Sequence, residues 1–273
     1  MGGAFVQFRG SSRIIYACRA GLSARPILTN RSSENDMPRF SANLGFLWPD
    51  RPLLDRIDAA AKAGFKAVEL HFPYDVPAEE VRATCQRNGV QLLGINTNVV
   101  PGDDGHVGLA AVPGRESDFA ELAEQALTYC AAAGGTAVHM MAGRVPLREQ
   151  DAGAHTLTRN LARAAPLAAD RGLTILLEPI NQRDMPGYFY SNVEEAAAII
   201  DRVGAPNVKL MFDVYHVGVS QGDVLTRLGQ DERAGADIER LRGFALEAHQ
   251  PVAEHRHAAG ALAPVAELEA LLA

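Results

Sequence analysis

Two carboxylate residues directly follow apolar runs of the sequence. Glu178 closes the run 173–177 (LTILL), and Asp213 follows the run 210–212 (LMF). An unpaired carboxylate buried among apolar side chains costs several kcal/mol, so core filling explains these residues poorly. Divalent cations prefer oxygen ligands, and an ion held between two carboxylates would assist proton transfer beside a carbonyl group. The pair therefore predicts a divalent metal site with acid–base chemistry.

Further polar residues occupy comparable places at the ends of apolar runs. Glu69 follows the run 67–68, His139 follows the run 136–138, and His216 comes three residues after Asp213. We expect these three side chains to be candidate substrate-binding residues. Each has a structural alternative, because a lone histidine is often a satisfied core or loop residue. Glu178 and Asp213 also have one, since they could cap loops or pair with Arg183.

Short apolar runs alternate with longer segments of helical periodicity between residues 37 and 228. Near-continuous apolar strands separated by amphipathic helices predict a parallel sheet with helices outside it. The carboxyl ends of such strands meet at one edge, where the candidate residues would lie together. We expect strands at 40–46, 67–70, 91–96, 136–140, 173–178 and 207–213. We expect helices at 53–63, 77–88, 115–133, 148–170, 191–203 with Ser191 as N-cap, and 221–228.

The fold class predicted from this alternation is α/β, a TIM (β/α)8-type barrel. A doubly wound open sheet is the competing fold, but the segment 45–49 (GFLWP) after the first strand lacks the GxGxxG fingerprint. The chain has 273 residues, the length of a complete barrel, yet only about six β/α units are visible. We therefore predict an incomplete barrel.

The two ends of the chain differ from this central domain, residues 37–228. Residues 1–36 are rich in Arg and Ser and poor in acidic residues, which is typical of a disordered leader, of a transit peptide, or of a start assigned upstream of Met37. Residues 229–273 are rich in alanine and contain no strand-like run, so we expect a divergent tail that is helical or irregular. An open six-strand barrel leaves sheet edges and apolar surface uncovered, which a homo-oligomer or the packed tail would cover.

The composition excludes several classes of partner. The chain has 26 Lys and Arg against 33 Asp and Glu, a net charge of −7, which disfavours binding to nucleic acid or to an anionic membrane. No apolar run reaches the roughly 18 residues of a membrane span. Three widely spaced cysteines form neither a disulfide framework nor a CxxC zinc motif, so we expect a reducing, cytoplasmic location.

Five motifs in register make the chain resemble the hydroxypyruvate isomerase family, which belongs to the xylose isomerase-like TIM barrels. The resemblance covers about residues 37–228, and any one of the motifs alone would be weak. The motifs are FSANL (40–44), VELHFPYD (68–75), LEPIN (177–181), RDMPGYF (183–189) and FDVYH (212–216).

The resemblance implies an enzyme that interconverts hydroxypyruvate and 2-hydroxy-3-oxopropanoate, with a place in glyoxylate metabolism. A proton would move between adjacent carbons through an enediolate, assisted by two glutamates and a divalent ion, Mg²⁺ or Mn²⁺. By motif match, Glu178 is the first catalytic glutamate and a metal ligand, and Asp213 is the second ligand. His216 and Glu69 correspond to groups on the substrate side. We add Arg183 as the residue that binds the substrate carboxylate, because a guanidinium can bind it through two parallel hydrogen bonds.

The sequence departs from the family pattern after Leu228. The family continues with a His-x-Gln motif, whose glutamine is a further ligand, and with a Cys-Glu-Tyr-like motif that carries the second catalytic glutamate. Neither motif is present, and Glu247, Glu254, Glu267 and Glu269 lie in helical or irregular context, so none of them inherits the role. The abrupt loss of pattern is typical of a changed reading frame or of a divergent terminus.

Alternatives to hydroxypyruvate isomerase therefore stay open. The chain could be a catalytically impaired remnant of the family, or a sister isomerase or epimerase acting on a four-carbon oxo-acid or a ketose. A DNA-repair endonuclease on the same barrel would need a basic groove, which the net charge disfavours. A non-enzymatic binding module remains if the tail replaces the missing barrel wall.

Overall fold

The structure is a computed structural model that describes residues 4–7, 39–100, 107–224 and 227. Seven strands form one sheet in the order β1-β2-β3-β4-β5-β6-β7, so neighbours in sequence are neighbours in space. Strands β2 to β7 are parallel, and β1 pairs antiparallel with β2. A doubly wound sheet reverses its strand order at a switch point, and the described strands show no such reversal. The expected parallel, barrel-type sheet is therefore confirmed.

The elements follow the predicted alternation closely. The strands are β1 (Ala4–Gln7), β2 (Arg39–Asn43), β3 (Ala67–Glu69), β4 (Gln91–Asn96), β5 (Ala137–His139), β6 (Thr174–Leu177) and β7 (Val208–Leu210). The helices are α1 (Leu53–Lys62), α2 (Ala78–Asn88), α3 (Glu116–Ala133), the short 3-10 helix η1 (Leu147–Glu149), α4 (Gln150–Asp170), α5 (Val193–Val203) and α6 (Val214–Ser220). Helices α2 and α5 end at Gly89 and Gly204, whose φ angles of 64° and 67° suit glycine.

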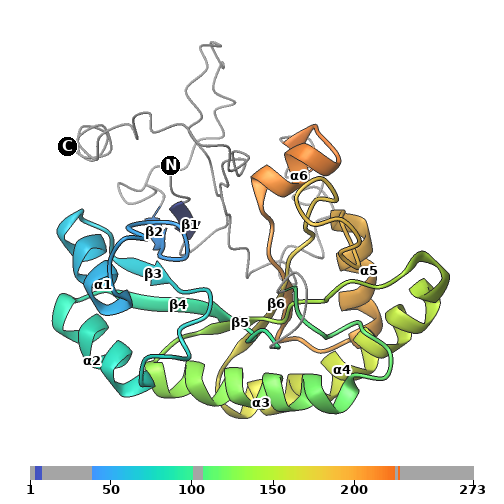
Figure 1. The fold of residues 1–273 in the computed structure, drawn as a ribbon, viewed down its shortest axis with the longest axis horizontal. Helices are drawn as coiled ribbons and strands as arrows, with labels where there is room; N and C mark the ends of the chain where they lie inside the picture. Colours follow the sequence, from blue (N-terminus) through green and yellow to red (C-terminus); the bar gives the residue numbers. More distant parts are fainter. Residues whose placement is uncertain (1–3, 8–38, 101–106, 225–226, 228–273) are drawn as a thin grey trace, which may run out of the picture.

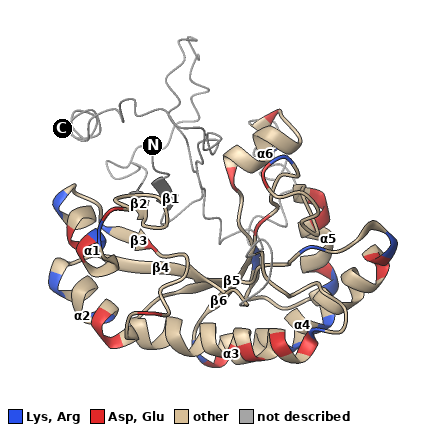
Figure 2. Cartoon of the chain, in the orientation of Figure 1, with Lys and Arg blue, Asp and Glu red and all other residues tan. Residues whose placement is uncertain are grey.

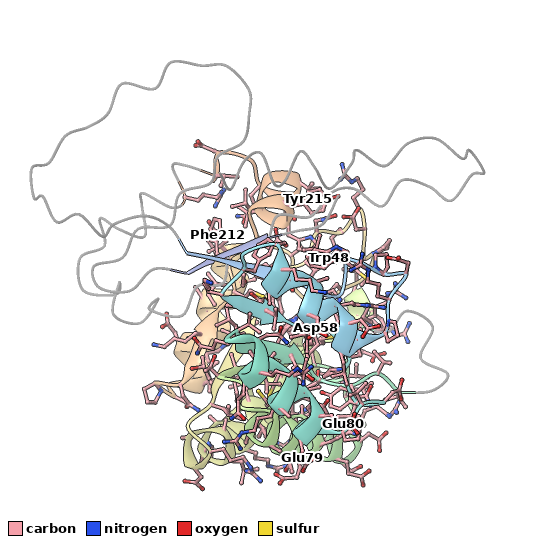
Figure 3. All side chains as sticks on the ribbon, turned by 90° about the vertical axis from the view of Figure 1, so that its left-hand side faces the viewer. Trp48, Asp58, Glu79, Glu80, Phe212 and Tyr215 are labelled. Atoms are coloured by element: carbon pink, nitrogen blue, oxygen red, sulfur yellow. The ribbon has the colours of Figure 1, made fainter. Side chains whose placement is uncertain are left out.

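The sheet curves, and helices α1 to α5 lie along its outer side (Figure 1). Acidic and basic residues are interspersed along these helices (Figure 2). Glu79 and Glu80 are exposed in the first turn of α2 (Figure 3), whereas Asp58 of α1 contacts Arg87 and Asn88 at the other end of that helix. Among the described helices, none is both long and apolar enough to cross a membrane.

Three details differ from the sequence-based expectations. The N-cap of α5 is Asn192 rather than Ser191, because the short Asn192 side chain accepts a hydrogen bond from the Glu195 backbone N–H. A helix begins at Val214, soon after β7, whereas a helix was expected only over 221–228. Asp213 explains the early start, because its side chain accepts hydrogen bonds from the second and third backbone N–H groups of α6.

The third difference concerns the first residues of the chain, where no strand was expected. Ala4–Gln7 forms β1 and pairs with the edge of β2 that the parallel strands leave open. The rest of the expected leader, and the tail over residues 229–273, lie outside the described residues. Of the helix expected at 221–228, residues 221–223 are not helical, Val224 and Arg227 are helical, and residues 225, 226 and 228 lie outside the described residues.

The alternation of side chains along each strand decides which residues face the helices. Val138, Ile175 and Leu177 belong to the main core between sheet and helices. Ala137, Leu176 and Met211 form a separate small cluster. Because successive strand residues point to opposite faces, this second cluster marks the inner face of the curved sheet.

Candidate metal and active site

The inner face of the sheet becomes polar at the carboxyl ends of its strands. In the parallel register Asn96 pairs with His139, and His139 pairs with Leu176. Glu178 lies two residues after Leu176, and Asp213 lies two residues after Met211, so both keep the inward direction of those side chains. Strand alternation therefore points His139, Glu178 and Asp213 toward the interior of the partial barrel.

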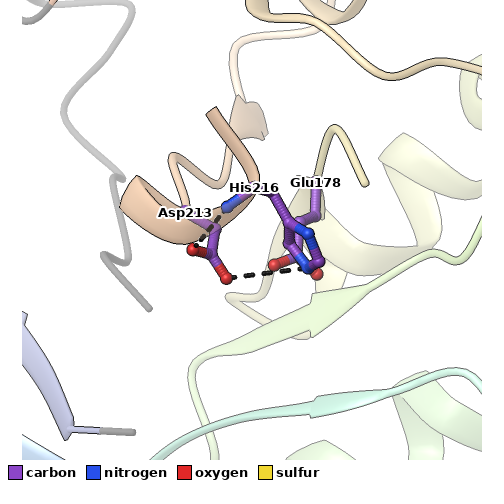
Figure 4. A group of neighbouring side chains, drawn as sticks. All are labelled: Glu178, Asp213 and His216. Carbon is purple, nitrogen blue, oxygen red and sulfur yellow. Dashed lines mark hydrogen bonds and ion pairs between the residues drawn. The ribbon is translucent and has the colours of Figure 1, made fainter. Parts of the chain in front are cut away.

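Glu178, Asp213 and His216 form a compact buried cluster (Figure 4). One possible ligand atom from each residue lies within 4.8 Å of the other two, and their exposed fractions are 5%, 0% and 6%. Two carboxylates this close together suit a divalent cation, and the imidazole of His216 lies beside them. The residues present therefore fit the divalent ion that the sequence predicts.

Asp213 is held in place by the first turn of α6. Its Oδ1 accepts hydrogen bonds from the backbone N–H of Tyr215 at 2.6 Å and of His216 at 3.2 Å. Its Oδ2 lies 3.8 Å from His216 Nε2. One carboxylate oxygen thus caps the helix, and the other faces the histidine that the same helix carries.

Glu178 lies beside a histidine and two buried tyrosines. His139 Nδ1 is 3.5 Å from Glu178 Oε2, and both side chains are almost fully buried. Burial raises the pKa of Tyr188 and Tyr190 well above the usual value, and the charge of Glu178 raises both further. The Tyr188 hydroxyl accepts a hydrogen bond from the Ala142 backbone N–H at 3.0 Å. Both phenols therefore stay neutral beside the Glu178 carboxylate.

Arg183 lies at the exposed rim of the site. Its Nη2 donates a hydrogen bond to the Tyr215 hydroxyl at 2.5 Å, and its Nε is 3.4 Å from Asp184 Oδ1. The Tyr215 hydroxyl donates in turn to Asp184 Oδ2 at 2.7 Å. Arg183 thus contacts Asp184 of its own loop and Tyr215 of α6. Its expected role as a binding group for the substrate carboxylate stays a prediction.

Glu69 lies at the end of β3 and is not part of the cluster of Glu178, Asp213 and His216. It is 8% exposed, and Oε1 accepts a hydrogen bond from the Ser41 hydroxyl at 2.6 Å. Both residues are on the inner face, because Asn43, two residues after Ser41, pairs with Glu69 in the parallel register. Its expected contact with substrate stays a prediction.

Three further residues near the candidate site carry no signal of their own in the sequence. Asn181 is fully buried and contacts His216, while Tyr188 and Tyr190 are buried within reach of the Glu178 charge. All three belong to the motifs LEPIN and RDMPGYF or follow them directly. Their position in or beside these motifs could have marked the three residues as candidates. No local sequence pattern, however, indicates which side chains of the motifs point into the partial barrel.

Comparison with known proteins places this arrangement in a family. The family model described as xylose isomerase-like TIM barrel matches residues 57–266. The match therefore continues past Leu228, where strand-like patterns end.

Individual relatives cover most of the chain. The 2-oxo-tetronate isomerase of Cupriavidus necator is 45% identical over 219 residues, covering 79% of this chain and 82% of that protein. The hydroxypyruvate isomerase of Escherichia coli is 33% identical over 195 residues, covering 71% and 76%. A crystal structure titled AP endonuclease, family 2, from Brucella melitensis superposes with a TM-score of 0.67 at 35% identity, covering 71% of this chain and 76% of that chain.

Proposed function

The chain belongs to the xylose isomerase-like TIM barrel family, and from this premise we propose that it isomerises short hydroxy-oxo acids. The buried cluster of Glu178, Asp213 and His216 carries the proposal. It combines an acid–base carboxylate, a place for a divalent ion and a second polar group on the substrate side. The substrate expected from the motifs is hydroxypyruvate.

The reaction moves one carbonyl group along a carbon chain without a net change in composition. A base removes a proton from C3 of hydroxypyruvate, and the electron pair of the C–H bond forms the C2–C3 double bond of an enediolate. A proton then returns to C2, while the O3 hydroxyl proton moves to O2. The product is 2-hydroxy-3-oxopropanoate, and neither oxidant nor reductant is needed.

Each cluster residue has a distinct role in this scheme. Glu178 accepts and returns the proton, since it is a buried carboxylate at the mouth of the barrel. Glu178 and Asp213 would hold a divalent ion, Mg²⁺ or Mn²⁺, which when bound stabilises negative charge on the substrate oxygens. His216 hydrogen-bonds a substrate oxygen.

Three further residues would contact the rest of the substrate. His139 lies beside Glu178 and helps to orient that carboxylate. Glu69 lies on the inner face of β3, and Arg183 at the rim binds the substrate carboxylate. A small acid would thereby be recognised at both of its ends. We propose no nucleic acid and no membrane as partner. We further propose a cytoplasmic homo-oligomer.

A second substrate is favoured by one specific observation. The relative that is 45% identical over most of both chains is named a 2-oxo-tetronate isomerase. A four-carbon 2-oxo acid differs from hydroxypyruvate in carrying a hydroxymethyl group at C3, so the same proton transfer between C3 and C2 applies. The alternative proposal is therefore 2-oxo-tetronate as substrate with unchanged roles for the cluster.

A deuterium-incorporation assay tests the proposal directly. The full chain is incubated with Mg²⁺ or Mn²⁺ and with hydroxypyruvate or 2-oxo-tetronate in D₂O, and the product is examined by NMR. We expect isomerised product with partial deuterium at C2, lost in Glu178→Gln and retained in the control Glu124→Gln, an exposed carboxylate paired with Arg171.

The relative rates with the two acids identify the substrate. Product formation that is unaffected by Glu178→Gln would refute the assigned role of Glu178. The absence of product with every acid tested would favour the catalytically impaired remnant.

A further inference from the structure

Asn181 links the rim of the site to the buried histidine through a chain of hydrogen bonds. Its Nδ2 donates to Asp184 Oδ2 at 3.0 Å, and its Oδ1 accepts from the Asp184 backbone N–H at 2.9 Å. These two contacts fix the orientation of the amide, because exchanging its oxygen and nitrogen would place donor against donor and acceptor against acceptor. The amino end of Asn181 is therefore held in a defined place.

That amino group also contacts His216. Asn181 Nδ2 lies 2.6 Å from His216 Nδ1, and the Asn181 backbone N–H points to the same ring nitrogen at 3.4 Å. Both groups are donors, so Nδ1 must act as acceptor and carry no proton. In a neutral imidazole the proton then resides on Nε2, which lies 3.8 Å from Asp213 Oδ2.

We propose that Asn181 is a positioning residue that fixes His216 in the Nε2–H tautomer. A protonated Nε2 is a hydrogen-bond donor and not a metal ligand. Within the buried cluster, an ion would then be held by Glu178 and Asp213, while His216 donates to a substrate oxygen. The consequence for turnover rests on the proposed isomerase function, whereas the tautomer itself does not.

Asp184 and Tyr215 are the outer part of this arrangement. Burial opposes ionisation of Asp184, but hydrogen bonds from Tyr215, Asn181 and Arg183 outweigh it and keep the pKa of the carboxyl below its usual value. An ionised Asp184 accepts from Asn181 and from Tyr215 at the same oxygen. The rim loop thus holds Asn181 in the orientation that His216 requires.

The test is the protonation pattern of the His216 ring, observed by NMR. The full chain is labelled with ¹⁵N-histidine, and long-range ¹H–¹⁵N spectra are recorded at a pH where the imidazole is neutral. Comparison with His216→Gln identifies the His216 signals among the eight histidines of the chain. We expect the Nε2–H pattern for His216, and an Nδ1–H pattern in the unaltered protein would overturn the proposal without any variant.

Two variants and a matched control extend the test. Asn181→Asp replaces the donor with an acceptor and should move the proton to Nδ1, whereas Asn181→Ala should leave a mixture of both tautomers. Asn207→Asp is the control. Asn207 Nδ2 also donates to two acceptors, the carbonyls of Ala165 and Leu173. Asn207 comes just before the first residue of β7, whereas the candidate site lies beyond the last one. The control should keep the Nε2–H pattern.

Kinetics with the preferred acid then measure the consequence for turnover. We expect Asn181→Asp to lower kcat on the order of 10–100-fold with a smaller change in KM. Folded variants at position 181 that both retain the wild-type tautomer would refute the positioning role. A shifted tautomer in a chain that isomerises none of the acids would support the role of Asn181 and refute the proposed function.

Discussion

Replacing Glu178 with glutamine should change the stability of the protein in opposite directions with and without a divalent cation. Without the ion, two buried carboxylates face each other with ligand atoms within 4.8 Å. At 4.8 Å and an effective dielectric constant of about 20, Coulomb's law gives a repulsion of about 3.5 kcal/mol between two unit charges. Proton uptake and the nearby histidines offset part of this, so we expect Glu178→Gln to stabilise the metal-free protein by about 1–2 kcal/mol.

With the ion present, the sign reverses. An ion at about 100 times its dissociation constant adds about 2.7 kcal/mol to the stability of the wild-type protein. Glutamine supplies only a neutral amide oxygen, so the variant should gain much less. The same carboxylate therefore destabilises the metal-free protein and stabilises the metal-bound one.

Urea unfolding in EDTA and in Mn²⁺ measures both effects. A gain of 1–2 kcal/mol moves the unfolding midpoint by roughly 0.5–1 M. Glu69→Gln is the matched control, because it removes a buried carboxylate that accepts a hydrogen bond from Ser41 outside the cluster. The control should lose about 1 kcal/mol and keep the wild-type response to Mn²⁺. A Glu178→Gln variant that gains as much from Mn²⁺ as the wild type would refute the metal site.

Three further predictions concern the scaffold. Asn192→Ala removes the N-cap of α5 and should lower the free energy of unfolding by about 1 kcal/mol, measured by urea unfolding. Burial raises the pKa of Cys85 to about 11 and of Cys130 to about 12, so in a Cys18→Ser background iodoacetamide at about pH 8 should label both thiols only in urea. The stabilising contribution of Asp184, whose pKa lies below the usual 3.8, should be present above that value and lost as the pH falls through the lowered pKa. Asp184→Asn should therefore flatten the pH dependence of the free energy of unfolding below the usual aspartate pKa of 3.8.

The alternation of strands and helices was predictable because its causes are local. Apolar periodicity and helix-stop glycines such as Gly89 act within a few residues, and the observed elements lie close to the expected ranges. Ser191 was expected to cap α5, but the neighbouring Asn192 does so. A choice between adjacent capping residues depends on backbone angles that composition does not fix.

The candidate site was likewise predictable only in part. That Glu178 and Asp213 would meet followed from their places at the ends of neighbouring parallel strands, and the structure brings them together. The surroundings of Glu178 did not follow, because Tyr188 and Tyr190, whose pKa values its charge raises, lie in a loop whose path no periodicity describes.

The sequence by itself determined the fold class, the family and the two carboxylates, since strand alternation and motif order are properties of the linear chain. Only the tertiary structure decided how each group is held. The contact between Asn181 and His216 joins residues 35 positions apart, and β1 pairs with β2 across the segment that separates them. Such contacts depend on the distance and direction of groups brought together by folding, and the proton position on His216 is their chemical consequence.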